Sequence, residues 1–312
     1  MTTTKQPTFL VVGAAKSGTT SLFYYLAQHP EIYVPAVKEV NYFCEPRGPY
    51  AKADAEYLAL FRWGAQKAGG EASVAYLFDE GAPQRIKQLL GAIKILIVLR
   101  NPADRAYSQW SFYNYRGEEP LGFEEALAAE QDRRNSAEFQ ANAHGHPGFF
   151  YYYWAGLYYE QVKHYIDTFG RENVHIDIFE ELVRDLPARC ANIFTLLGVD
   201  PDFQPNFTVY NEQQTYKNKW LKEMLSTARP GFVNKTYEAL PVALRMRVFQ
   251  VARKVYWSNM KEAPKRQMDP KVRERLLEAY QDDISQLSDL LGCDLSAIWL
   301  APKPVAQLAG QQ

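Results

Sequence analysis

The segment that most constrains this chain is FLVVGAAKSGTTSLFYYL, residues 9–26. A short apolar, β-branched run leads into a loop with two glycines and then into apolar residues at helical spacing, which is the order strand, tight loop, helix N-terminus. In such a loop backbone N–H groups converge, glycine allows close approach of a ligand, and the helix dipole adds about half a positive charge. The segment therefore predicts a phosphate-binding loop over Gly13–Thr20.

Side chains add further donors to this loop, because it carries a lysine and four consecutive or nearly consecutive hydroxyls. The alternative is an ordinary strand–helix turn in which a serine or threonine only caps the helix. The density of donors favours a ligand. The predicted cofactor contacts are Gly13, Lys16, Ser17, Gly18, Thr19, Thr20 and Ser21.

The loop departs from the Walker A pattern in two ways. The Walker lysine follows the second glycine, but Thr19 stands there and the lysine lies upstream, at Lys16. A P-loop NTPase also ends another strand with an aspartate that helps to hold magnesium, whereas the run KILIVL, residues 94–99, is followed by Arg100. A guanidinium suits phosphate and repels a metal ion. Both departures predict nucleotide chemistry without magnesium.

The alternation of short β-branched runs with helical stretches predicts an α/β fold. The runs FLVV, KILIVL and NVHIDIF are typical of buried parallel strands, so we expect a three-layer, P-loop-like fold with a central, mostly parallel sheet flanked by helices. The clearest helix is expected from Lys271 to Leu291, between Pro270 and Gly292. Other helices are expected to start at Ser21, near Ala103, at Phe123, at Tyr158 and near Ala188, the last closed by Gly198.

The 312 residues suit a single domain over 1–312, with a nucleotide-binding core at about 8–200 and a basic helical part at about 211–300. The apolar runs are too short to span a bilayer and the N-terminus lacks a signal pattern, so a cytoplasmic protein is expected. The three cysteines, at 44, 190 and 293, are too scattered for a disulfide framework or a CxxC metal site.

Two motifs taken together resemble a known family. With GAAKSGTTSL at 13–22 and ILIVLRNPADRAYSQW at 95–110, the chain resembles the sulfotransferases that use 3'-phosphoadenosine 5'-phosphosulfate (PAPS), and it is most similar to the bacterial and heparan-sulfate-type branch. Further matches are KEVNYF at 38–43, GEASVAYL at 70–77, GLYYEQVKHYIDTFG at 156–170 and DLSAIW at 294–299.

The resemblance implies roles for individual residues. The first motif would bind the 5'-phosphosulfate, and Arg100 and Ser108 would bind the 3'-phosphate. Lys16 is assigned to the bridging and leaving oxygens, where charge develops in the transition state. Glu39 matches the family's base for an acceptor hydroxyl, and Lys38 would contact the sulfuryl oxygens or orient that carboxylate. Without the resemblance, the last two residues would be interpreted as a solvated ion pair.

One departure affects the charge available for catalysis. Many heparan-sulfate-type relatives carry a lysine, then Ser or Thr, then proline after a Gly-Glu pair, whereas this chain has Ala72, Ser73 and Val74. The positive charge is therefore expected from Lys16 and Lys38. Two interpretations of Ser73 stay open, as a residue that binds substrate or as a structural residue at a strand end.

The acceptor region offers several candidates. His144 or His146 is an alternative base, or part of an irregular loop. The aromatic run FFYYYWAGLYY at 149–159 would line the acceptor pocket in part and fill the core in part.

The segment 217–275 contains fifteen Lys or Arg and five Asp or Glu. Its stretch at 240–257 would contact an anionic membrane surface or an acidic carrier protein, or pack as an ordinary helix with snorkelling arginines. The resemblance implies that Lys217 or Lys219 closes over the 3'-phosphate.

These observations predict a metal-independent sulfotransferase that moves the sulfuryl group of PAPS in line to an acceptor hydroxyl, less readily to an amine, and releases 3',5'-adenosine bisphosphate. The acceptor would be a small molecule, a lipid, or a polyketide-type or glycosylated substrate, free or held on a carrier protein, and no nucleic acid partner is expected. A P-loop nucleotide kinase or NTPase and a non-catalytic nucleotide-binding module are the alternatives.

Overall fold

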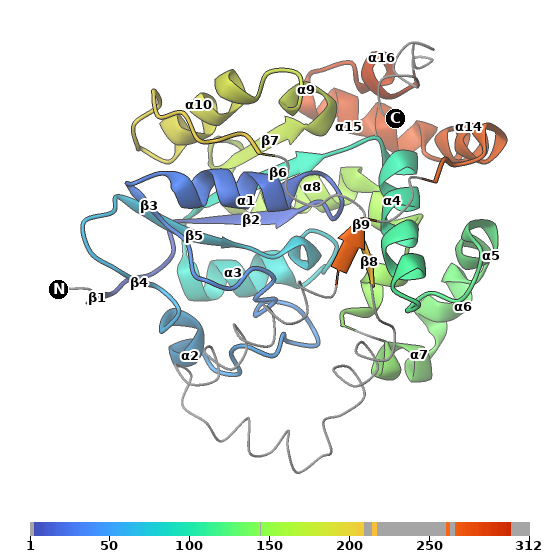
Figure 1. The fold of residues 1–312 in the computed structure, drawn as a ribbon, viewed down its shortest axis with the longest axis horizontal. Coiled ribbons are helices and arrows are strands. Elements are labelled where there is room, and N and C mark those ends of the chain that lie inside the picture. The colour runs from blue at the N-terminus through green and yellow to red at the C-terminus, as the bar shows by residue number, and fades with distance from the viewer. Residues whose placement is uncertain (1–2, 144, 209–213, 217–259, 263–265, 301–312) are drawn as a thin grey trace.

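The computed structural model describes residues 3–143, 145–208, 214–216, 260–262 and 266–300, labelled as in Figure 1. The strands are β1 (Thr3–Thr4), β2 (Phe9–Gly13), β3 (Ile32–Tyr33), β4 (Arg62–Trp63), β5 (Ala68–Ala72), β6 (Lys94–Leu99), β7 (Val174–Ile178), β8 (Gln214–Tyr216) and β9 (Met260–Glu262). The α-helices are α1 (Thr19–Gln28), α2 (Asp54–Leu58), α3 (Ala82–Leu90), α4 (Pro102–Tyr115), α5 (Phe123–Ala128), α6 (Glu130–Asn135), α7 (Ala137–Asn142), α8 (Tyr158–Phe169), α9 (Phe179–Leu182), α10 (Leu186–Leu196), α14 (Pro270–Ala279), α15 (Gln281–Leu291) and α16 (Leu295–Trp299). Short 3-10 helices are η1 (Val74–Tyr76), η2 (Pro147–Phe150), η3 (Trp154–Gly156) and η4 (Arg171–Asn173).

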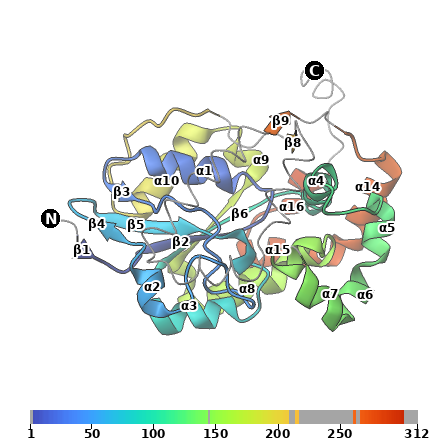
Figure 2. The same cartoon turned by 60° about the horizontal axis from the view of Figure 1, so that its bottom comes forward.

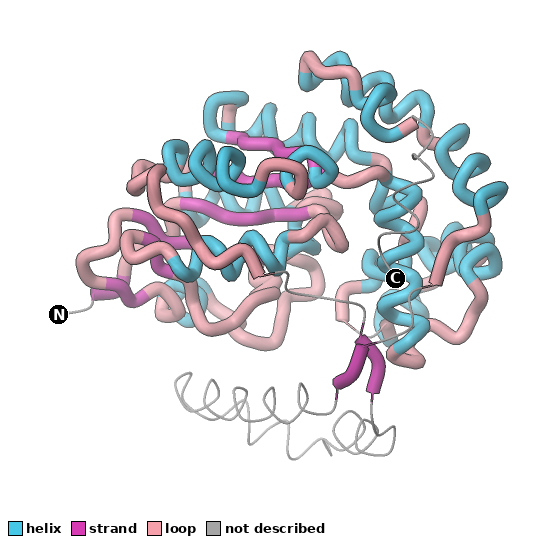
Figure 3. Tube along the Cα trace, turned by 45° about the horizontal axis from the view of Figure 1, so that its top comes forward, coloured by secondary structure: helices cyan, strands magenta, loops and turns pink. Residues whose placement is uncertain are grey.

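Five parallel strands form the central sheet in the order β3-β5-β2-β6-β7. The predicted α/β class is therefore confirmed, and so are the three strands predicted from FLVV, KILIVL and NVHIDIF. The strand β5 was not expected, because its sequence AGGEA lacks the β-branched residues that mark a strand. The pair β8–β9 is antiparallel and stands apart from this sheet in Figure 3.

Side chains that point alternately to the two faces of the sheet divide the hydrophobic core into two layers. Phe9 and Val11 of β2 join the cluster that contains residues of α1 and α10, whereas Leu10 and Val12 join the larger cluster with α3, α8 and α15. Successive side chains of a strand point to opposite faces, so both faces of a buried parallel strand must be apolar. Figure 2 shows the resulting three layers, with α1 and α10 on one side of the sheet and α3 and α8 on the other.

The predicted helix starts agree with the structure to within two residues. The observed first residues are Thr19, Pro102, Phe123, Tyr158 and Leu186, and Gly198 after α10 adopts the left-handed conformation, with φ of 70°.

The prediction of one unbroken helix over 271–291 is wrong. The segment forms α14 and α15, which meet at Tyr280, and Gly292 ends α15 in the left-handed conformation with φ of 66°. The Tyr280 hydroxyl donates to the Tyr153 carbonyl at 2.8 Å, and the two rings stack with centroids 4.7 Å apart. Apolar spacing continues through the break, so the pattern gave no sign of it.

The three cysteines are free, as expected from their spacing. Within the described ranges, no helix has the length and apolar character needed to span a bilayer.

Candidate active site

The phosphate loop joins the carboxyl end of β2 to the N-terminus of α1. Gly18, the residue before the helix, has φ of 79°, and a Cβ there would meet the Phe179 ring at 3.0 Å. Both facts require glycine at this position. The first turn of α1 contains no acidic residue, so the partial positive charge of the helix N-terminus is not neutralised locally.

A pocket of about 530 Å³ opens beside this loop. It brings together most of the residues predicted from sequence, from three separate segments of the chain. Its lining includes Lys16, Gly18, Thr19, Thr20, Ser21, Lys38, Glu39, Arg100 and Ser108.

Two predicted cofactor contacts do not line this pocket. Gly13 is buried, and a Cβ there would lie 2.5 Å from the Cβ of Leu77, so this glycine allows a side chain rather than a ligand to approach β2. Ser17 is also fully buried, and its hydroxyl has no hydrogen-bond partner in the part of the chain that the structure describes. Lys217, Lys219 and His144 lie outside the described residues.

Lys16 occupies the centre of a positively charged wall. Its Nζ lies 4.4 Å from the centroid of the Phe112 ring. Burial is the largest cause that lowers the pKa of Lys16, and together with the charges of Arg100, Arg116 and Lys38 it brings this pKa to about 7. Four cationic side chains therefore converge on one pocket, which suits an anion with several charges and disfavours a metal ion.

Arg100 follows β6 directly and faces the phosphate loop. Its Nη1 donates to the Lys16 carbonyl at 2.9 Å, and its guanidinium lies 5.0 Å from the centroid of the Phe179 ring. Ser108 reaches the same pocket from α4. The donors of this pocket thus fit a nucleotide with two separate anionic groups.

The asparagine between these two residues has a structural role. The Asn101 side chain caps α4 by accepting from Asp104 N–H at 3.1 Å and donates to the Trp299 carbonyl at 2.8 Å. Glu180 completes the arrangement, because its carboxylate accepts from Asn101 N–H at 3.0 Å and from the Trp299 indole at 3.0 Å. The DLSAIW segment therefore fixes the end of the strand that carries Arg100.

Lys38 and Glu39 contact each other as an ion pair inside the pocket. Their side chains are 11% and 34% exposed, so the alternative of a solvated surface pair does not describe them. The other oxygen of the Glu39 carboxylate accepts from Val74 N–H at 2.9 Å. Glu39 has φ of 64°, a conformation that is costly for a residue with a side chain and often found at functional sites.

The contacts of Ser73 support a structural role at the strand end rather than substrate binding. Ser73 is fully buried. Its hydroxyl donates to the Glu71 carboxylate at 2.7 Å and accepts from Asn41 N–H at 2.9 Å.

Sequence reasoning missed several residues of the pocket wall. Gln109, Phe112, Tyr113 and Arg116 line it from α4 and its C-terminal end, beside Ser108. Their spacing of one, four, five and eight residues from Ser108 places them on one helical face, so the pattern would have revealed them once Ser108 was fixed in the site.

Of the aromatic run at 149–159, only Phe149 lines this pocket in the described structure. Phe150, Tyr152 and Tyr158 are buried in the core, and Tyr153 and Trp154 line a separate pocket between α8 and α15.

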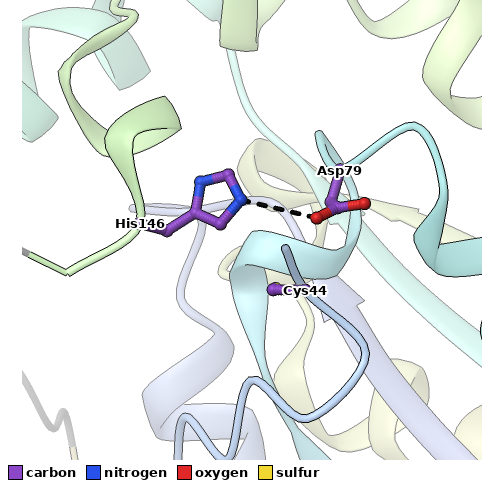
Figure 4. Close-up of side chains that lie close together, drawn as sticks. All are labelled: Cys44, Asp79 and His146. Atoms are coloured by element: carbon purple, nitrogen blue, oxygen red, sulfur yellow. Dashed lines mark ion pairs between the residues drawn. The ribbon is translucent and has the colours of Figure 1, made fainter. Parts of the chain in front are cut away.

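His146 does not line the pocket beside the phosphate loop. Its Nδ1 accepts from Gly148 N–H at 3.1 Å, and its Nε2 lies 3.4 Å from Oδ2 of Asp79, as Figure 4 shows. Cys44 lies in the same group, which among the described residues is the one that resembles a metal-ligand set. The Asp79 carboxylate already accepts from Glu45 N–H, Gly81 N–H and the Arg85 guanidinium, and burial raises the pKa of the Cys44 thiol. These contacts describe an anchored carboxylate rather than a cation site.

The geometry can be compared with known proteins. The family model described as "Sulfotransferase domain" matches residues 6–290. The chain belongs to this family. It is accordingly a transferase of the sulfotransferase class, as the motifs predicted, and the donor that the family implies is PAPS.

A crystal structure of a sulfotransferase from Alicyclobacillus acidocaldarius is 31% identical, with a TM-score of 0.70, and the match covers 95% of this chain and 100% of that one. Membrane-associated sulfotransferase kil1 of Dictyostelium discoideum is 36% identical over 110 residues, which are 34% of this chain and 23% of that protein. Human bifunctional heparan sulfate N-deacetylase/N-sulfotransferase 2 is 33% identical over 120 residues, 36% of this chain and 13% of that protein. The chain thus matches less than a quarter of the length of these two relatives.

Proposed function

We propose that this sulfotransferase uses PAPS as its donor, passes the sulfuryl group to an acceptor hydroxyl and releases 3',5'-adenosine bisphosphate. The observation that carries the proposal is the convergence of Lys16, the Arg100–Ser108 pair and Glu39 on one pocket. The proposal includes no metal, because the basic side chains of Lys16, Lys38, Arg100 and Arg116 already face the site. It also includes a cytoplasmic location for the protein.

The binding roles follow from the donors on each wall. The N-terminus of α1 and the hydroxyls of Thr19, Thr20 and Ser21 would hold the 5'-phosphosulfate, since hydroxyls and a helix N-terminus both favour an anion. Arg100 and Ser108 would hold the 3'-phosphate, which ATP lacks, and so distinguish the two nucleotides.

The donor supplies an activated sulfuryl group, and side chains of the protein manage the charge around it. Lys16 would stabilise the negative charge that grows on the leaving oxygen. Glu39 would take the proton of the acceptor hydroxyl as its oxygen bonds to sulfur. Lys38, in contact with Glu39, would orient that carboxylate.

The acceptor side of the pocket supports a substrate with an apolar or planar part. Phe112, Tyr113 and Phe149 line it, with Leu182 and Leu186 at its edge. A small molecule, a lipid, or a polyketide-type or glycosylated substrate carrying a hydroxyl, free or bound to a carrier, fits this wall, and an amine is the less favoured acceptor.

The test measures binding and transfer separately. The wild-type protein should bind 3',5'-adenosine bisphosphate in the presence of a metal chelator, discriminate against ATP, and transfer labelled sulfate from PAPS to members of a panel of alcohols, phenols and glycans. Lys16→Ala should lower the transfer rate by about a hundredfold or more. Lys87→Ala is the matched control, because Lys87 also lies over an aromatic ring, that of Phe169 at 5.5 Å, but outside the pocket.

Two results would overturn the proposal. ATP binding that is tight and lost on chelation of magnesium would indicate a nucleotide kinase or NTPase. Normal binding of the bisphosphate with no transfer across the panel, by a protein whose Lys16→Ala variant behaves identically, would indicate a non-catalytic binding module.

A further inference from the structure

Behind the proposed base lies a buried carboxylate that the reaction scheme does not use. Glu71, on β5, is 0% exposed. Each of its oxygens accepts from a hydroxyl, Oε2 from Ser73 at 2.7 Å and Oε1 from Tyr76 at 2.7 Å. A carboxylate buried in this way is stable only with such hydrogen bonds.

Both hydroxyls also accept hydrogen bonds from the backbone that follows Glu39. Asn41 N–H donates to the Ser73 hydroxyl at 2.9 Å, and Tyr42 N–H donates to the Tyr76 hydroxyl at 2.9 Å. A hydroxyl can donate one hydrogen bond, and both of these hydroxyls donate theirs to the Glu71 carboxylate. The lone pairs of both oxygens are therefore directed towards the two backbone N–H groups.

The backbone held in this way has an unfavourable conformation. Glu39 and Asn41 have φ of 64° and 51°, in the left-handed region. Such a conformation is unfavourable for a residue with a side chain and persists only where the surroundings determine it. Further contacts come from the same segment as Ser73 and Tyr76, because Glu39 N–H donates to the Ala72 carbonyl at 2.9 Å and Val74 N–H donates to the Glu39 carboxylate.

We propose that Glu71 is a positioning residue, which fixes the backbone beside Glu39 through the Ser73 and Tyr76 hydroxyls and so sets the direction of the proton-accepting carboxylate. The inference rests on the proposed role of Glu39 as the base. The two carboxylates then differ in function: Glu39 would contact the acceptor, whereas Glu71 contacts only other residues of the protein.

The proposal predicts a response to pH. Only the ionised carboxylate accepts from both hydroxyls at once, and burial raises the pKa of Glu71 to about 7. The ionisable groups that face it are Glu39, which raises this pKa, Lys38, which lowers it, and the buried side chains of Cys44, Tyr57, Tyr76 and Tyr165. Protonation of Glu71 should therefore loosen the Glu39 backbone as the pH falls through neutrality.

The experiment compares three substitutions in the full chain: Glu71→Gln, Ser73→Ala and Tyr76→Phe. Each should lower kcat about 10- to 100-fold, the scale of a small misplacement of a reacting group. The dissociation constant of 3',5'-adenosine bisphosphate should stay within about twofold, because none of these residues lines the pocket. Glu71→Gln should also shift or remove the acidic limb of the pH–kcat profile, which a purely structural role would not alter.

Tyr57→Phe is the matched control for Tyr76→Phe. Tyr57 is equally buried and packs on Tyr42, with ring centroids 4.7 Å apart, but its hydroxyl has no hydrogen-bond partner in the described structure. Its removal should leave kcat within about twofold, since it breaks no bond to the Glu39 backbone. If Glu71→Gln does not fold, the two hydroxyl variants still test the proposal, and their combination should cost less than the sum of the separate effects because they act through one carboxylate.

The outcomes separate this inference from the proposed function. Full transfer activity of the Glu39→Gln variant would refute the proposed role of Glu39 as the base. If Glu39→Gln abolishes transfer but Ser73→Ala, Tyr76→Phe and a folded Glu71→Gln keep the wild-type kcat and pH profile, the positioning role is refuted and the base stands.

Discussion

The two ends of the pocket are built by different means. At the donor end, residues 16–21 are adjacent in sequence, and strand, loop and helix place them by local geometry. At the acceptor end, Lys38 and Glu39 depend on a separate segment, η1 and the end of β5, and face α4. The difference teaches that the proposed phosphate site can be encoded in one short motif, whereas the position of the proposed base depends on contacts with distant segments.

The largest expected effect comes from a substitution at the acceptor end alone, which should lower kcat without changing nucleotide affinity. Glu39→Gln should lower kcat by about 10²–10⁴-fold, the range for loss of a general base, and leave the affinity for 3',5'-adenosine bisphosphate within about twofold. Steady-state transfer assays and calorimetry measure the two quantities. Glu80→Gln, which lies outside this pocket, is the control. Equal losses in kcat and in nucleotide affinity would show that the two ends are not separable.

The next largest effect is expected from a substitution at the donor end, which should weaken nucleotide binding. Arg100→Ala should weaken binding of 3',5'-adenosine bisphosphate about 10- to 100-fold, because a hydrogen bond to a charged group contributes about 1.5–3 kcal/mol. Binding of adenosine 5'-phosphate, which lacks the 3'-phosphate, should change little.

Arg47→Ala is the control for this comparison, since Arg47 also lies over a ring, that of Tyr42 at 4.8 Å, but not in this pocket. Equal weakening of both nucleotides by Arg100→Ala would contradict the assignment of Arg100 to the 3'-phosphate.

A pH titration sharpens the description of the donor end. Burial and three neighbouring cations hold the pKa of Lys16 near 7, and a bound anion would raise it. Above pH 7 the free protein has lost the proton that the complex keeps, so nucleotide affinity should fall as the pH rises, by at most about tenfold per unit.

Calorimetry in buffers of different ionisation enthalpy should detect the proton taken up on binding. Lys16→Arg should remove the effect, because a guanidinium stays charged over this range. An affinity that is constant from pH 7 to pH 9 in the wild-type protein would count against a titrating Lys16.

The smallest effect concerns the support of the donor end. Trp299→Phe removes the hydrogen bond from the indole to Glu180 and keeps most of the ring packing. The loss should be about 1 kcal/mol of unfolding free energy, or about 2–4 °C in Tm, measured by thermal denaturation. Trp63→Phe, in a different part of the core, shows the cost of reducing ring size alone.

The features that could be predicted from sequence alone are those that depend on residues close together in the chain. The phosphate loop, Arg100 and the helix starts follow from residues within one or two turns of each other. The break at Tyr280 was missed because apolar spacing continues through it, and the contact of Tyr280 with Tyr153, 127 residues away, leaves no local pattern. The contact of Gly13 with Leu77 also joins residues far apart in sequence, so the local pattern did not show that a side chain packs against this glycine. Likewise, a pattern could place Glu39 in the site only through family resemblance, because the contacts that hold it come from residues 71–76.

The hydrogen bond from Asn101 to Trp299 also bears on the order in which the protein is completed during synthesis. The two residues are 198 positions apart. At a translation rate of about 5–20 residues per second, the strand that carries Arg100 leaves the ribosome about 10–40 s before the helix that anchors it. The hydrogen bond between Asn101 and Trp299 can therefore form only late in synthesis, and a nascent chain that ends before Trp299 would carry the phosphate-loop motif without this anchor.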